Sequence, residues 1–212
     1  MRGISVVAAA LAVAACAGSP GPLACAEADW FSLGQEDGLV GARKGAFKSR
    51  ADQCEDADAP VRRDLYDEGY GAGLAAYCTA AGGFHAGRDA LKYEDVCAAE
   101  ETAAFLTAYG LGEKLRRMEA AAEDAASRHQ KALKDFDMNK FSLKVARNRL
   151  NDPYAAGSDV TAARSDVEYH VGELRRLDAA LPKLSQKAAT AAAELAAYKA
   201  ELVAAGLISS TE

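Results

Sequence analysis

Cysteine is the residue type with the clearest chemical potential in this chain of 212 residues. Four cysteines, Cys25, Cys54, Cys78 and Cys97, lie within one stretch of the sequence. An even set of this kind predicts two disulfides in an oxidising compartment. The sequence leaves three connectivities open, and we choose Cys25–Cys54 with Cys78–Cys97 because these pairs close the shortest loops. A structural zinc site is the alternative, but no two of the four have C-x-x-C spacing, so we expect no metal.

The histidines do not complete a catalytic site. His129 and His170 fall in a region of helical pattern, where a solvated or half-buried histidine is usual. No serine or cysteine nucleophile is spaced for activation by a base, so we expect neither catalysis nor a cofactor. The polar residues that could bind a small ligand or a glycan are Asp37, His85 and Arg88, together with neighbouring aromatic side chains. In a small domain, most of those aromatic side chains are expected in the core.

The N-terminal segment predicts export and a lipid anchor. An apolar run from Ile4 to Ala15 is too short to span a bilayer, which takes about 20 residues. It ends in Val-Ala-Ala before Cys16 and resembles the lipobox of bacterial lipoproteins, so we expect cleavage before Cys16 and lipid on its sulfur. Ordinary cleavage after Ala26 is the alternative, but that site lies well past the apolar run. Ala17, where an aspartate would favour the inner membrane, favours the periplasmic face of the outer membrane.

The charge balance limits the partners. The chain has 31 acidic and 25 basic side chains, a net charge of −6. Coating nucleic acid needs a net basic surface, so we expect no nucleic-acid partner.

The composition divides the chain into parts. Most glycines and the only tryptophan lie before residue 110, and long Ala/Leu/Lys/Glu/Arg tracts follow it. We expect a signal peptide over 1–15, a lipidated tether over 16–27, and a small disulfide-stapled helical domain rich in Gly and Cys over 28–110. An antiparallel coiled-coil hairpin would follow over 111–205, and a tail over 206–212. The expected fold class is therefore mainly α.

Glycines recur four residues apart in the first part, in the pairs Gly34/Gly38, Gly69/Gly73 and Gly83/Gly87. In a helix such a pair makes a smooth stripe on one face. Each internal glycine costs about 1 kcal/mol relative to alanine, so something must offset it. Close packing of helix backbones is the favoured explanation, and exposure of backbone to a ligand is the alternative.

The second part has the spacing of a coiled-coil seam. Apolar or small residues recur at steps of three and four, on both sides of a Pro/Gly-containing loop over 151–159. Pro182 is expected to kink or restart the second helix. Basic residues before the loop and acidic residues after it would face each other in an antiparallel hairpin. The seam positions are Leu111, Leu115, Met118, Ala122, Ala125, Ala132, Phe136, Leu143 and Leu150, then Val160, Ala163, Val167, Val171, Leu174, Leu177, Leu181, Leu184, Ala188, Ala191, Leu195, Tyr198 and Leu202.

Taken together, the cysteine, glycine and aromatic spacings of residues 25–112 resemble the DUF2799 lipoproteins of proteobacteria. The resemblance is carried by Cys25 to Trp30, Gly34-x-x-Asp37-Gly38-x-x-Gly41, Cys54, Tyr66-x-x-Gly69-x-x-x-Gly73-Leu74-x-x-Tyr77-Cys78, Gly83-x-x-x-Gly87, Tyr93-x-x-Val96-Cys97 and Phe105-x-x-x-Tyr109. It implies a lipobox-bearing envelope protein with a coiled-coil tail, and the family implies no activity.

Two functions follow as hypotheses. The first is a non-catalytic envelope lipoprotein whose hairpin binds an envelope protein or a second copy of the chain. The second is a module that binds a small ligand or glycan in the Gly/Cys-rich domain, through Asp37, His85 and Arg88. Substitutions of exposed hairpin residues, or of His85 and Arg88, would distinguish the two.

Overall fold

The computed structural model describes residues 25–43, 45–55 and 59–209. The expected signal peptide and Cys16 lie outside the described residues. Within the described part, no helix combines the length and apolar character needed to cross a membrane.

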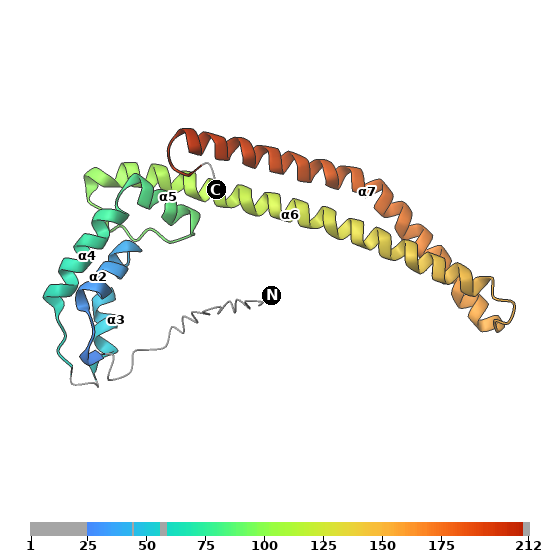
Figure 1. Ribbon diagram of the computed structural model, residues 1–212, viewed down its shortest axis with the longest axis horizontal. Helices are drawn as coiled ribbons and strands as arrows, with labels where there is room; N and C mark the ends of the chain where they lie inside the picture. Colours follow the sequence, from blue (N-terminus) through green and yellow to red (C-terminus); the bar gives the residue numbers. More distant parts are fainter. Residues whose placement is uncertain (1–24, 44, 56–58, 210–212) are drawn as a thin grey trace, which may run out of the picture. The chain divides into compact units, whose positions relative to one another are not determined.

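The described residues form helices and no strand, which confirms a mainly α fold (Figure 1). Two helices begin at side-chain caps: Asp29 accepts a hydrogen bond from the backbone of Ser32, and Thr79 accepts one from Gly82. The helices are α2 (Trp30–Leu39), α3 (Ala46–Asp52), α4 (Arg63–Tyr77), α5 (Ala80–Arg88), α6 (Ala99–Leu150) and α7 (Gly157–Ala204).

The chain divides into two compact units. The first contains the described residues up to Ala76 together with Glu94–Val96, and the second contains Tyr77–Tyr93 and the residues from Cys97 onward. Each unit has its own apolar core, around Trp30 and Tyr66 in the first and around Phe84 and Leu115 in the second.

In the first unit, α2 and α4 pack with their backbones in contact. A Cβ atom added at Gly34 would lie 2.1 Å from the carbonyl oxygen of Tyr66, and one added at Gly69 would lie 2.0 Å from that of Phe31. Real Cβ atoms do not approach so closely, so only glycine allows this crossing. The preference for packing over ligand exposure at these glycines is therefore confirmed.

In the second unit, α5 packs on the start of α6 in the same way. A Cβ atom at Gly83 would lie 2.3 Å from the carbonyl oxygen of Phe105, and one at Gly87 would lie 2.0 Å from that of Tyr109. Gly112 of α6 completes the crossing, 2.0 Å by the same measure from the carbonyl oxygen of Phe84.

The two helix pairs share further details. Three residues after the last glycine of each first helix, the backbone turns into the left-handed region, at Gly41 (φ +62°) and Ala90 (φ +59°). A tyrosine of the second helix then donates its hydroxyl to the next carbonyl oxygen. Tyr70 donates to Ala42 over 2.6 Å, and Tyr109 donates to Leu91 over 2.8 Å. The α2–α4 pair and the α5–α6 pair thus follow one structural pattern.

Helices α6 and α7 form the expected antiparallel hairpin, joined by residues 151–156 (Figure 1). Near its base, Tyr198 donates its hydroxyl to the carbonyl oxygen of Leu111 over 3.1 Å. Near its turn, Arg149 lies 3.9 Å from Asp166, one of the oppositely charged pairs expected there. Every seam position named from the sequence is buried or half-buried, so the seam is confirmed.

Pro182 does not restart the second helix. Helix α7 continues through it from Gly157 to Ala204, and the helix bends along its length (Figure 1). Proline lacks an N–H and crowds the carbonyl of the residue four positions earlier, which bends a helix rather than ending it when packing holds both sides.

The structure places the domain boundary elsewhere than between residues 110 and 111. Helix α6 begins at Ala99 and runs unbroken through that point, so the hairpin and the end of the Gly/Cys-rich part share one helix. The expected tail over 206–212 is also shorter, because Leu207 and Ile208 pack into the core around Phe84. Burial of these two apolar side chains holds the chain against the core after the end of α7.

Candidate functional site

Asp37 is the one charged or polar residue that is buried in the described part of the chain, 7% exposed on α2. Arg50 of α3 donates to both of its carboxylate oxygens, from Nη2 over 2.8 Å and from Nε over 3.3 Å. Tyr66 of α4 donates its hydroxyl to Oδ2 over 2.8 Å. The carboxylate therefore joins three helices of the first unit.

The electrostatics of this cluster follow from its burial. Burial raises the pKa of Tyr66 far above its ordinary value, and the hydrogen bond to Asp37 raises it further, because ionisation would place a second negative charge against the carboxylate. The hydrogen bond to Asp37 also raises the pKa of Arg50. Arg50 and Tyr66 are thus held as a cation and a neutral phenol.

His85 and Arg88 belong to the second unit and lie three residues apart on α5. His85 is exposed and its ring contacts the edge of Phe84. Arg88 lies 3.7 Å from Glu119 of α6, and the same carboxylate oxygen lies 3.0 Å from Lys199 of α7. Arg88 therefore contributes to a charge network that links three helices.

The structure does not bring the three ligand candidates into one described site. Asp37 lies in the first unit, with its carboxylate engaged by Arg50 and Tyr66, and the other two candidates lie in the second. The aromatic residues behave largely as expected for a core. Trp30, Tyr66, Tyr77 and Phe84 are buried, and Phe31, Tyr70 and Tyr93 are half-buried.

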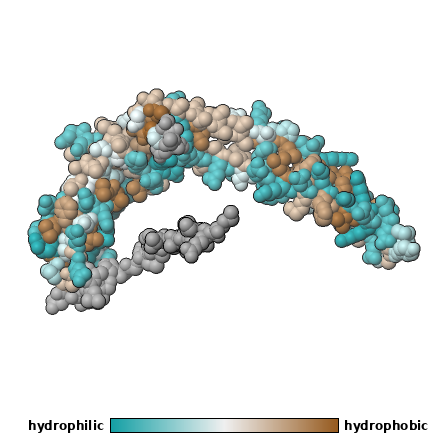
Figure 2. Space-filling view, viewed as in Figure 1, coloured by the Kyte–Doolittle hydropathy of each residue, from teal (hydrophilic) through white to brown (hydrophobic). Residues whose placement is uncertain are grey.

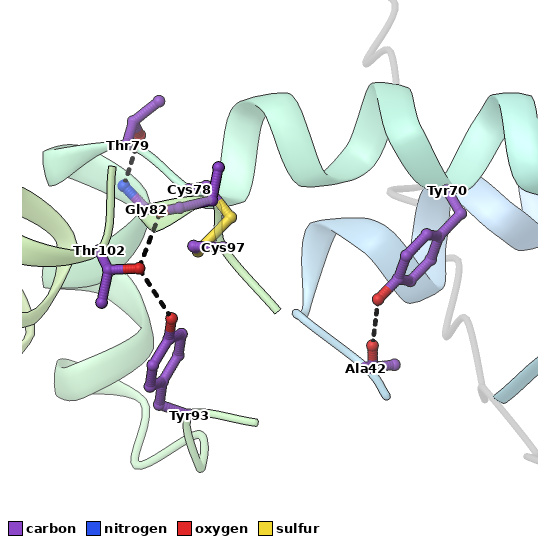
Figure 3. Close-up of a disulfide and its surroundings, with 9 residues drawn as sticks. Ala42, Tyr70, Cys78, Thr79, Gly82, Tyr93, Cys97 and Thr102 are labelled. Atoms are coloured by element: carbon purple, nitrogen blue, oxygen red, sulfur yellow. Dashed lines mark hydrogen bonds between the residues drawn. A yellow bond between two sulfur atoms is a disulfide. The ribbon is translucent and has the colours of Figure 1, made fainter. Parts of the chain in front are cut away.

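Both disulfides have the expected pairing. Cys25 is joined to Cys54, and Cys78 to Cys97, with 29 and 19 residues of sequence separation. Figure 3 shows the second disulfide next to Thr79, the residue that caps α5. The Cys25–Cys54 disulfide lies in the first unit and the Cys78–Cys97 disulfide in the second, so each unit has its own covalent crosslink. No group of three or more metal-ligating side chains gathers in the described residues.

The comparison with protein families agrees with these spacings. Residues 29–114 match the family model described as a protein of unknown function, DUF2799. This segment is a DUF2799 domain. No curated protein and no solved structure matches the chain.

The DUF2799 domain spans both glycine-crossed helix pairs and ends inside α6. Its two halves therefore share the same crossed helix pair, although the two pairs lie in different compact units. Helix α6, the last helix of the domain, continues beyond residue 114 as the first helix of the hairpin.

Sequence reasoning missed Arg50, the partner of Asp37. It also missed a groove of about 260 Å³ between the start of α2 and the end of α3. Arg50 lies on a short helix with no apolar periodicity and no motif, so nothing in the sequence distinguishes it from other surface arginines. The groove is lined by Ala28, Asp29, Ser32, Leu33, Arg50, Gln53 and Cys54.

Proposed function

We propose that this chain is a non-catalytic lipoprotein of the cell envelope that acts as an interaction module through the α6–α7 hairpin. Lipid on Cys16 would hold it to the periplasmic face of the outer membrane. The lipobox-like end of the N-terminal apolar run supports the anchor. Two disulfides support an oxidising compartment, because such bonds persist outside the reducing cytosol.

The observation that carries the interaction role is a second apolar stripe on α6. Met138, Phe141 and Val145 follow steps of three and four, the spacing of a coiled-coil seam. They lie on a different face from the seam with α7. Met138 is 61% exposed and Phe141 is 68% exposed. Figure 2 shows apolar surface interleaved with polar surface along the hairpin.

The exposed apolar side chains concentrate in this part of the hairpin. Single exposed apolar residues are common, but a cluster of them marks an interaction surface. Five of the ten large apolar side chains that are exposed in the described residues lie in the half of the hairpin that contains the turn: Leu133, Met138, Phe141, Tyr154 and Tyr169.

Charge favours another protein over a second copy of this chain as the partner. Between residues 131 and 149, α6 has six basic side chains and two acidic ones. Two copies meeting through this stripe would bring like charges together, which disfavours the contact. The partner proposed is an envelope protein that presents an apolar surface with acidic residues beside it.

The test is proximity labelling from the protein in its own envelope. Replacing Met138 and Phe141 by serine should abolish labelling of the partner. The free energy of unfolding should stay within about 0.5 kcal/mol, because both side chains are exposed. Leu106→Ser, at an exposed apolar position outside the stripe, is the matched control. Unchanged labelling in the double variant, or equal loss in the control, would contradict the proposal.

The anchor has its own test. Cys16→Ser should abolish incorporation of labelled fatty acid and release the protein from membranes, because the acyl chains supply the membrane affinity. A variant that still takes up label and sediments with membranes would show that Cys16 is not the anchor.

A further inference from the structure

The two halves of the DUF2799 domain share one crossing of two helices. Comparing their side chains at matching positions therefore shows which side chains that crossing does not require. The backbone contacts match at Gly34/Gly83, Gly38/Gly87 and Gly73/Gly112, whereas Ala108 takes the position of Gly69. Gly34 meets the carbonyl of Tyr66 as Gly83 meets that of Phe105, and the residue before the next glycine is Asp37 in one half and Ala86 in the other. The second half therefore forms the same crossing with an alanine and a phenylalanine where the first has Asp37 and Tyr66. The scaffold does not require the buried carboxylate.

Helix α3 is the element that distinguishes the first half. It occupies the connection between α2 and α4, whereas residues 89–98, which connect α5 to α6, contain no helix. Asp37 holds α3 in place through Arg50. A buried ion pair carries a desolvation cost, so its presence in only one half needs a reason beyond the shared fold.

What α3 adds is the groove between α2 and α3. Its volume of about 260 Å³ lies just below the range of roughly 300–1,000 Å³ usual for ligand pockets, so it suits a small molecule. Ala28, Leu33 and the half-cystine Cys54 make its wall largely apolar, and Asp29 and Arg50 supply charge at its rim.

The charge around the groove is negative. The cation of Arg50 is already matched by Asp37, and Glu36 lies 3.8 Å from it. Asp29 is exposed, and the hydroxyl hydrogen bond from Ser32 lowers the pKa of its carboxyl. Across residues 25–76 eleven side chains are acidic and six are basic. An anionic ligand would be repelled, and a cationic ligand would be attracted.

We propose that the groove between α2 and α3 binds a small molecule that has an apolar body and a protonated amine. The apolar body contacts Ala28 and Leu33, and the amine pairs with the carboxylate of Asp29. This site is independent of the hairpin and of the interaction proposed for it.

The test uses three probes of equal chain length and different charge: hexylamine, hexanol and hexanoate. Amide NMR shifts of Ser32, Leu33 and Gln53 in the full chain report on the groove directly. We expect saturable shifts with hexylamine, weaker binding of hexanol and none of hexanoate. No saturable shift with hexylamine, or equal binding of all three probes, would overturn the proposal.

Two variants distinguish binding in the groove from attraction by the net negative charge of the first unit. Asp29→Asn retains a good helix cap and should weaken hexylamine binding by roughly two- to fivefold, as loss of an exposed ion pair does. Asp67→Asn removes an equal charge from α4 outside the groove and should leave binding unchanged. Equal effects of the two variants would overturn the site. So would binding of a lysine-containing peptide more than tenfold tighter than hexylamine, since the occupant would then be a protein side chain.

Discussion

At the scale of single residues, the free-energy cost of burying Asp37 explains why Arg50 and Tyr66 donate hydrogen bonds to its carboxylate. A carboxylate that is 7% exposed is stable only when its oxygens accept hydrogen bonds and its charge is matched. Arg50 supplies the charge and Tyr66 supplies a neutral donor. Removing one partner should therefore harm the fold more than removing the whole set.

A set of variants tests this coupling. Arg50→Leu alone should cost roughly 2–4 kcal/mol of unfolding free energy, because it leaves a buried charge without its cation. Adding Asp37→Ala and Tyr66→Phe gives these two positions the residue types that the second half has in Ala86 and Phe105. The triple variant should therefore be no less stable than Arg50→Leu in denaturant titrations. If the three single costs simply add, the residues do not act as a unit.

The raised pKa of Tyr66 gives a prediction about pH. A group whose pKa is higher in the folded state stabilises fully below its unfolded pKa, here about 10, and loses that contribution as the pH rises above it. The unfolding free energy of the native protein should therefore fall above pH 10. Tyr66→Phe retains the ring and should make this fall shallower. Equal slopes for the two proteins above pH 10 would contradict the assignment.

At the scale of elements, glycine decides how closely helices approach. Gly69 and Gly71 lie two residues apart on α4 and form a matched pair. A Cβ at Gly69 would meet the carbonyl oxygen of Phe31 at 2.0 Å, whereas nothing lies within 4 Å of one at Gly71.

The two alanine variants should therefore shift stability in opposite directions. Gly71→Ala should stabilise the protein by about 0.5–1 kcal/mol through helix propensity. Gly69→Ala should destabilise it by about 1–3 kcal/mol, because the helices must move apart. Guanidinium titration of both proteins measures the difference. A gain in stability for Gly69→Ala would show that the backbone contact is not needed.

The sequence predicted these elements unevenly, for physical reasons. Glycine spacing, cysteine order and the seam are local patterns, so the crossings, the disulfides and the hairpin could all be anticipated. The boundary at residue 110 could not be placed, because the shift in composition there does not interrupt the helix, and Gly112 packs against α5 instead of ending α6. The pairing of Arg50 with Asp37, 13 residues apart on different helices, arises only when the fold brings α2 and α3 together.

At the scale of the whole molecule, the hairpin is anchored in the core of the second unit. Tyr198 and Leu202 near the end of α7 pack with Phe84 of α5 and Leu115 of α6. The chain thus returns to the DUF2799 domain after about 48 residues of α7. Farther along, alanine is common at the seam, and it buries less apolar area than leucine would. Stability should therefore be greatest at the base of the hairpin and lower along the alanine-rich middle of the seam, around Ala122, Ala125, Ala188 and Ala191.

A cysteine pair at Ala122 and Ala188 tests the register of the hairpin within one chain. Both positions are half-buried on the seam. They lie between two contacts that fix the register, Lys199 with Glu119 and His170 with Asn139.

With Cys16 replaced and the native disulfides kept oxidised, a short bismaleimide should join the two new thiols within a monomer. Peptide mass spectrometry identifies the link, and Thr190→Cys in place of Ala188→Cys is the control, because Thr190 is exposed beside the seam. Crosslinks that form only between chains would mean that α6 and α7 pair with those of a second copy, and an equal yield from the control would mean that the seam does not hold this register.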